Sequence, residues 1–211
     1  MKTHQYLIAV AAMATIIAGS NFLVQFPVLA QIGALNLADL LTYAAFTFPV
    51  AFLVTDLTNR LFGSTAARKV VFAGFVIAVL VSIVLASPRI AIASGSAFLI
   101  SQLLDVSIFD KLRNGQWWKA PLVSSFLGAI IDTAIFFSFA FSTSFSFLGE
   151  GLDFAVQPAP LLGVLATEAP RWVSWALGDL VVKVAMALVL LAPYSILRRN
   201  LEQALSKTTT A

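Results

Sequence analysis

Long uninterrupted apolar runs limit more than any other feature how this chain can fold. A helix needs about 20 mostly apolar residues to cross the hydrocarbon core of a bilayer, which is about 30 Å thick. Six segments of the sequence meet that requirement, at about residues 6–28, 37–56, 69–86, 90–109, 120–147 and 172–197. They are too long and too continuous for barrel strands, which alternate apolar and polar residues. Proline predicts irregular backbone at residues 22–27 and 46–49, within the first two segments. The sequence therefore predicts an all-α integral membrane protein with six transmembrane helices.

The composition supports this prediction. Hydrophobic residues make up 60% of the 211 residues and charged residues only 11%, against about 45–50% and 25% in soluble proteins. A soluble domain of this size has too much surface for its volume to bury so many apolar side chains. We expect residues 1–200 to form one six-helix transmembrane domain, and residues 201–211 to form a short polar cytoplasmic tail.

The residues that are absent exclude several classes of site. Without cysteine the chain has no disulfide scaffold, thiol nucleophile or cysteine metal site. Its single histidine, His4, cannot form a histidine metal cluster or a catalytic triad. The net charge of +3 lies in short loops, with no basic stripe interleaved with aromatic residues. We expect no cofactor, no bound metal and no nucleic-acid partner.

Basic residues predict the orientation, because cytoplasmic loops of membrane proteins carry an excess of lysine and arginine. With six spans and a cytoplasmic N-terminus, ten basic residues fall on the cytoplasmic side. Only Arg89 and Arg171 fall outside. Both termini are therefore expected in the cytoplasm. Four tryptophans at span ends, among them Trp175, are interpreted as an interfacial belt.

Polar side chains within the apolar segments are the candidate functional residues, since a charge at the bilayer centre costs about 2.5–3.5 kcal/mol. Asp56 and Arg60 are four residues apart, on one helical face, where they can form an ion pair. Asn59 lies near that face. A binding site and a structural ion pair both remain open. Gln102 shares a face with Asp105, which favours either a site or interhelical hydrogen bonds.

Asp132 lies deepest, because counting from residue 120 at about 1.5 Å per residue places it near the midplane. Its sequence neighbours are apolar and none is basic, so it needs a partner on another helix, a proton or a ligand. Asp179 and Lys183 are four apart and can neutralise each other as a structural pair. Asn21 and Gln25, also four apart, suit either an organic ligand or interhelical contacts.

The available chemistry favours binding and transport over catalysis. The chain has no phosphate-binding loop and no nucleophile elbow. Carboxylates and amides can accept and donate hydrogen bonds at the edge of a flat polar solute, and phenylalanine rings can stack on its faces. A channel, with selectivity from charge rings, remains an alternative.

Several long motifs resemble the queuosine-precursor transporter family, also described as a vitamin-uptake transporter family. They are residues 20–28 (SNFLVQFPV), 46–63 (FTFPVAFLVTDLTNRLFG), 102–113 (QLLDVSIFDKLR) and 117–121 (WWKAP). Further matches are Arg89, Asp132, Asp179 and Lys183. The resemblance extends over nearly the whole chain except residues 148–171.

The resemblance implies an inner-membrane importer of the guanine-like bases 7-cyano-7-deazaguanine and its aminomethyl relative. The polar residues that also lie in the family motifs are the expected substrate-binding residues. They are Asn21, Gln25, Asp56, Asn59, Arg89, Gln102, Asp105 and Asp132.

Three classes of mechanism remain open at this point. The first is a self-sufficient carrier embedded in the lipid bilayer, with uniport or proton coupling. The second is a substrate-capture subunit of an energy-coupling-factor importer, which needs separate ATPase partners. The third is a membrane-integral modifying enzyme. Because a carrier of this size has few helices for alternating access, we expect a homodimer.

Overall fold

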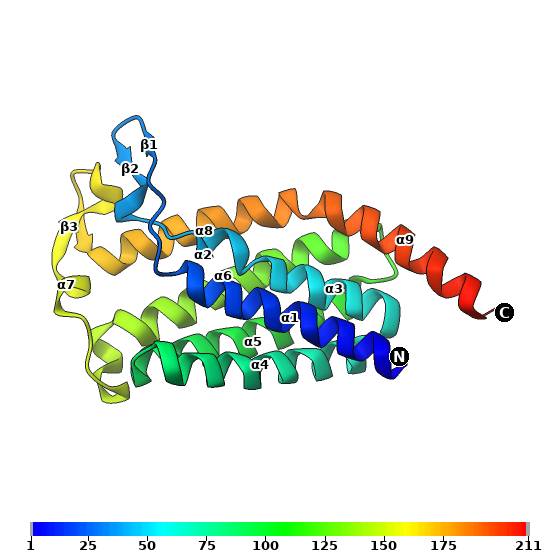
Figure 1. The fold of residues 1–211 in the computed structure, drawn as a ribbon. Coiled ribbons are helices and arrows are strands. Elements are labelled where there is room, and N and C mark those ends of the chain that lie inside the picture. Colours follow the sequence, from blue (N-terminus) through cyan, green and yellow to red (C-terminus); the bar gives the residue numbers. More distant parts are fainter. Residues whose placement is uncertain (1, 210–211) are drawn as a thin grey trace.

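Long helices lie side by side in this computed structural model, which describes residues 2–209 (Figure 1). The helices are α1 (Thr3–Leu23), α2 (Ala44–Thr47), α3 (Val50–Phe62), α4 (Ser64–Leu85), α5 (Pro88–Leu112), α6 (Lys119–Phe141), α7 (Asp153–Val156), α8 (Arg171–Val189) and α9 (Leu191–Thr209). Short 3-10 helices are η1 (Leu37–Asp39), η2 (Thr143–Leu148) and η3 (Leu161–Gly163). Two antiparallel hairpins pair β1 (Gln31–Ile32) with β2 (Leu35–Asn36), and β3 (Pro158–Pro160) with β4 (Glu168–Pro170).

Five helical segments are long and apolar enough to cross a membrane within the described part of the chain. They are Thr3–Leu23, Ser64–Ser82, Pro88–Leu112, Lys119–Phe141 and Arg171–Ser206. The last one joins α8 and α9 across a turn at Leu190. These segments confirm an all-α membrane protein.

The predicted segment 37–56 is not one continuous helix. It is divided into η1, α2 and the first half of α3, with Phe48 and Pro49 between α2 and α3. Proline has no N–H to continue the helical hydrogen bonds, and it disfavours helix in the residue before it. The irregular backbone expected at residues 46–49 is therefore present as a short break.

Two helices end earlier than the apolar runs do. The first apolar run extends to residue 28, but α1 ends at Leu23, and the irregular backbone predicted at residues 22–27 begins at Val24, with Pro27 paired to Thr42 in an isolated bridge. The prediction of helix to residue 147 is wrong, because α6 ends at Phe141 and η2 follows. In both places apolar residues continue in turns that fold over the end of the bundle.

Both described ends of the chain lie at one end of the bundle, and the two hairpins lie at the other (Figure 1). The main buried core joins α1, α4 and α5 through Met13, Val70 and Val106. A smaller core at the terminal end joins Phe109 of α5 to Tyr194 of α9. α9 continues through the residues that the sequence assigns to the polar tail.

Candidate functional site

A cavity of about 810 Å³ lies inside the bundle. Residues of α1, α5, α6 and α8 line it, together with the broken segment α2–α3. Residues 36–42 and 158–163, in and beside the two hairpins, line it as well. It therefore runs from the hairpin end into the interior of the helices. Its volume is within the range of about 300–1,000 Å³ that is typical of small-molecule sites.

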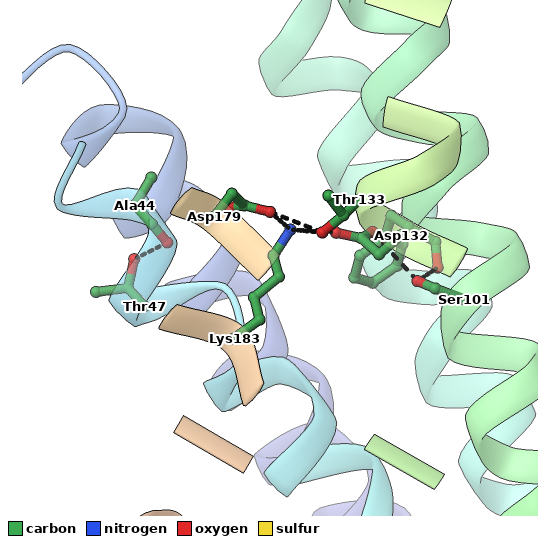
Figure 2. Close-up of polar contacts among 8 residues, drawn as sticks. Ala44, Thr47, Ser101, Asp132, Thr133, Asp179 and Lys183 are labelled. Carbon is green, nitrogen blue, oxygen red and sulfur yellow. Dashed lines mark hydrogen bonds and ion pairs between the residues drawn. The ribbon is translucent and has the colours of Figure 1, made fainter. Parts of the chain in front are cut away.

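A buried cluster of three charges lies in the wall of this cavity (Figure 2). Nζ of Lys183 on α8 lies 2.7 Å from Oδ2 of Asp132 on α6 and 2.5 Å from Oδ2 of Asp179, one turn earlier on α8. Thr133 donates to Asp179 at 2.8 Å, and Ser101 of α5 donates to Asp132 at 3.3 Å. The cluster thus connects three helices.

One lysine faces two carboxylates, so the cluster carries a net charge of about −1 if all three groups are ionised. The Lys183 side chain is only 5% exposed, whereas the side chains of Asp132 and Asp179 are 20% and 14% exposed. The exposed parts of the carboxylates lie in the cavity wall. The cluster therefore offers hydrogen-bond acceptors, and a surplus negative charge, to whatever enters the cavity.

Two amide side chains add one donor and one acceptor. Gln102 of α5 accepts a hydrogen bond from Thr55 through Oε1 at 2.6 Å, and its amide nitrogen has no acceptor among the described residues. Asn21 of α1 donates to the carbonyl oxygen of Ile17 at 2.9 Å, which leaves Oδ1 as an acceptor. Both residues line the cavity.

Aromatic side chains form the part of the wall nearer the hairpins. Phe136 and Phe141 of α6 make an edge contact with ring centroids 6.1 Å apart, and Phe141 makes another with Trp175 of α8 at 5.4 Å. The ring centroids of Phe154 of α7 and Trp175 lie 6.3 Å apart. All four line the cavity. Flat aromatic walls with polar groups at one end suit a planar heterocycle.

The break between α2 and α3 also borders the cavity, through Ala45, Phe48 and Phe52. Irregular backbone is tolerated at membrane depth only where protein or a cavity surrounds it. Ser20 of α1 donates to the hydroxyl of Thr47 at 2.7 Å, which ties the end of α2 to α1. Interrupted helices of this kind border the binding sites of many transporters.

Three of the predicted residues, Asp56, Asn59 and Asp105, form a second buried group outside the cavity lining. All three are at most 2% exposed. The expected ion pair between Asp56 and Arg60 is wrong for the described residues. Arg60 instead donates to the hydroxyl of Tyr194 and to a main-chain carbonyl, because its long side chain reaches the end of the bundle.

Arg89 and Gln25 lie near the hairpin end and are not among the cavity-lining residues. Arg89 is 3% exposed and donates to three main-chain carbonyl oxygens, of Phe139, Ser142 and Gly149. It thereby holds the end of α6 and the η2 segment. Gln25 is exposed, just after the end of α1.

The cavity thus contains three of the eight predicted residues: Asn21, Gln102 and Asp132. The cavity also contains Lys183 and Asp179, which were not predicted site residues because their spacing indicates a structural pair, although a lone intramembrane lysine is a signal for a site. Trp175 was not predicted either, because a tryptophan at a span end is typical of an interfacial belt. The described residues hold no group of three or more His, Cys, Asp or Glu side chains that could bind a metal.

Comparisons with known proteins give consistent matches. A family profile described as "Putative vitamin uptake transporter" matches residues 42–87 and 80–197. The "Queuosine precursor transporter" of Escherichia coli (strain K12) is 34% identical over 199 residues, covering 84% of this chain and 79% of that protein. The "Probable queuosine precursor transporter" of Haemophilus influenzae is 40% identical over 156 residues, covering 61% and 66%. No solved structure matches the chain.

Proposed function

The chain belongs to the vitamin uptake transporter family and is a multi-pass inner-membrane protein, and from this we propose that it imports guanine-like precursors of queuosine. The substrates are 7-cyano-7-deazaguanine and its aminomethyl relative. The observation that carries the proposal is the cavity whose wall combines the Lys183–Asp132–Asp179 cluster with aromatic rings.

The hydrogen-bonding groups of the cavity complement this class of base. A guanine-like ring edge presents an N–H and an exocyclic amine as donors beside a carbonyl acceptor. Asp132 and Oδ1 of Asn21 can accept from the donors, and the amide nitrogen of Gln102 can donate to the carbonyl. The surplus negative charge suits the aminomethyl cation, and the phenylalanine wall suits the linear nitrile. A buried polar group left unpaired costs about 1–3 kcal/mol, which discriminates against bases with a different edge.

Five of the predicted site residues lie outside the cavity lining and stay predictions: Gln25, Asp56, Asn59, Arg89 and Asp105. We propose that they support the helix bundle or couple transport to an energy source, and that they do not contact the base directly. Asn21, Gln102 and Asp132 are the proposed contacts, joined by Asp179 and Lys183.

We further propose six crossings, with α2 and α3 together making the second. Two observations support this: the described termini lie at one end of the bundle, and basic residues cluster there at the ends of α3, α5 and α9. Both termini then face the cytoplasm, and the hairpin end with its open cavity faces outward.

The protein is proposed to act alone, as a carrier and not an enzyme, in the form of a homodimer. A substrate-capture subunit that needs ATPase partners is the second candidate. Expression in a host without queuosine-precursor uptake and without such partners tests this choice. Uptake of labelled nitrile base under these conditions supports the carrier, and its absence despite binding supports the capture subunit.

Competition against labelled nitrile base tests the substrate class. We expect unlabelled nitrile and aminomethyl bases to compete and the sugar-bearing nucleoside to fail. Gln102→Leu should weaken binding about 5- to 100-fold through the lost hydrogen bond. The exposed Gln116→Leu, outside the cavity, serves as the control. Strong inhibition by the nucleoside with none by the aminomethyl base would refute the proposed binding mode.

A further inference from the structure

The second buried group has its own chemistry. We propose that Asp56 and Asp105 hold one proton between them, and that this proton crosses the membrane together with the substrate. The proposal rests on the proposed transport function and adds the ion that drives it. The two residues are called the aspartate pair below.

The geometry of the aspartate pair is that of two facing carboxyl groups. Asp56 on α3 is 2% exposed and Asp105 on α5 is 0% exposed, and their carboxyl groups are within hydrogen-bonding reach of each other. Ser124 and Ser125 of α6 donate to Asp56 at 3.4 and 3.3 Å. Ser124 also faces Asp105, but neither carboxylate oxygen of Asp105 has a hydrogen bond of ordinary geometry from the described residues.

No basic side chain of the described residues forms an ion pair with either carboxylate. Lys183 and Tyr194, which line a small cavity together with Asp56, and Arg60 are engaged elsewhere. Arg60 donates to Tyr194 of α9, and Lys183 of α8 is paired with Asp132 and Asp179.

Two ionised carboxylates are acceptors only, so they repel and cannot bond to each other. One proton changes this, because a carboxylic acid donates to the neighbouring carboxylate. It removes one of two uncompensated negative charges from a buried site, and it gives the oxygens of Asp105 a hydrogen-bond donor. Sharing of one proton by neighbouring carboxyl groups is well known in aspartic proteases.

The aspartate pair is connected to the substrate cavity through two helices. Gln102 precedes Asp105 by about one turn of α5, and Thr55, next to Asp56 on α3, donates to Gln102 at 2.6 Å. A ligand that forms a hydrogen bond with Gln102 is therefore bound about one helical turn from the shared proton. A small cavity of about 20 Å³, lined by Asp56 and Lys183 among others, has room for about one water molecule between the pair and the charged cluster.

Asp132, the proton candidate that the sequence suggests, is less suited to this role. Its carboxylate is 2.7 Å from the ammonium group of Lys183 and accepts a further hydrogen bond from Ser101. The Asp132 carboxylate therefore has both a counter-charge and a hydroxyl donor. The aspartate pair has no such counter-charge, so it is the group that needs a proton.

Infrared spectroscopy of the full chain in liposomes tests for the proton directly. We expect the C=O stretching band of a protonated carboxylic acid at neutral pH in the wild type. The band should disappear in the double variant Asp56→Asn/Asp105→Asn and persist in Asp132→Asn. Asp153→Asn, an exposed residue at the start of α7, is the matched control. Absence of the band from the wild type would overturn the shared proton.

Accumulation of the uncharged nitrile base in proteoliposomes tests the coupling. With no membrane potential, a pH gradient of one unit, acid outside, should support about tenfold accumulation, because one proton per substrate contributes a factor of ten per pH unit. Asp105→Asn should accumulate nothing, yet continue to exchange labelled for unlabelled base without a gradient. Exchange shows that this variant is folded and binds substrate. Asp56→Asn repeats the test should Asp105→Asn fail to fold.

Three results would overturn the coupling. They are accumulation that ignores the pH gradient, accumulation that follows a sodium gradient, and tenfold accumulation by Asp105→Asn. A wild type that neither binds nor exchanges the base would instead refute the proposed function, and the coupling with it, whatever the infrared band shows.

Discussion

Arg60 and Arg113 each donate a hydrogen bond to the main-chain carbonyl oxygen of the other. Nη1 of Arg60 lies 2.5 Å from the oxygen of Arg113, and Nη2 of Arg113 lies 3.2 Å from the oxygen of Arg60. These carbonyls lie at the C-terminal ends of α3 and α5, where helical partners are missing and cations are favoured. These two reciprocal hydrogen bonds hold α3 and α5 together at the end of the bundle opposite the hairpins.

Removing one of these arginines should loosen that end. Arg113→Ala loses the bond to Arg60 and the 3.1 Å ion pair with Asp110. We expect the free energy of unfolding to fall by about 1.5–3 kcal/mol, the usual range for a hydrogen bond to a charged group, and amide exchange at residues 113–118 to accelerate. Arg68→Ala, an exposed arginine near the start of α4, is the control. Equal exchange rates in both variants would contradict the role of the arginines.

Lys183→Met should destabilise the fold severely. It leaves Asp132 and Asp179, two partly buried carboxylates in the cavity wall, without a cation. Breaking a buried ion pair by removing one partner costs about 3–5 kcal/mol. The midpoint of thermal unfolding in detergent measures the effect, and an unchanged midpoint would show that the cluster is not a source of stability.

Asp132→Asn separates stability from binding. Lys183 keeps its 2.5 Å partner Asp179 in this variant, and the amide can still accept from Ser101. We therefore expect a fold close to that of the wild type but clearly weaker binding of the nitrile base. A variant that binds normally would remove Asp132 from the proposed contacts.

Gly128→Ala should damage the cavity wall. A Cβ atom at Gly128 of α6 would lie 2.7 Å from Cε1 of Phe52, a buried cavity residue of α3. Overpacking of this kind typically costs about 1–3 kcal/mol, and displacement of the ring should reduce affinity for the base. Gly19→Ala is the matched control, because a Cβ there meets nothing within 4 Å. Equal thermal midpoints and affinities for the two variants would contradict the close packing.

The proposed orientation can be tested with single cysteines, since the natural chain contains none. Thr167→Cys lies in the loop between β3 and β4, and Gln116→Cys lies between α5 and α6. An impermeant thiol reagent should label the first in intact spheroplasts and the second only after permeabilisation. The reverse pattern would place the cavity opening on the cytoplasmic side.

The apolar runs were sufficient to predict five spanning segments, because helix in a bilayer follows from length and hydropathy. Hydropathy alone does not show where α1 ends, since the residues around Pro27 remain apolar, whereas the proline itself predicts the irregular backbone there. Segment 37–56 is equally apolar, yet Pro49 divides it. Local backbone chemistry decides these boundaries, and hydropathy does not record it.

Only part of the site could be predicted from the sequence, for a related reason. The pairing of Asp179 with Lys183 follows from their spacing on one helix, and it is confirmed. The pairing of Lys183 with Asp132 joins α8 to α6 across 51 residues and depends on how the helices pack. The same dependence explains the wrong prediction for Arg60, whose spacing allowed a pair with Asp56 but whose guanidinium group lies among the helix ends.

The break at Pro49 has a consequence for the speed of transport. In hydrocarbon, bending an intact helix requires a main-chain hydrogen bond to open without water to replace it, which slows each cycle. Pro49 has no N–H to donate to the preceding turn, so fewer main-chain hydrogen bonds join α2 to α3 than in an intact helix, the 3.0 Å bond from Ala51 to the oxygen of Phe48 being one that remains. We expect this covalent property of one residue, built in when the chain is synthesised, to lower the activation barrier to any tilt of α2 against α3.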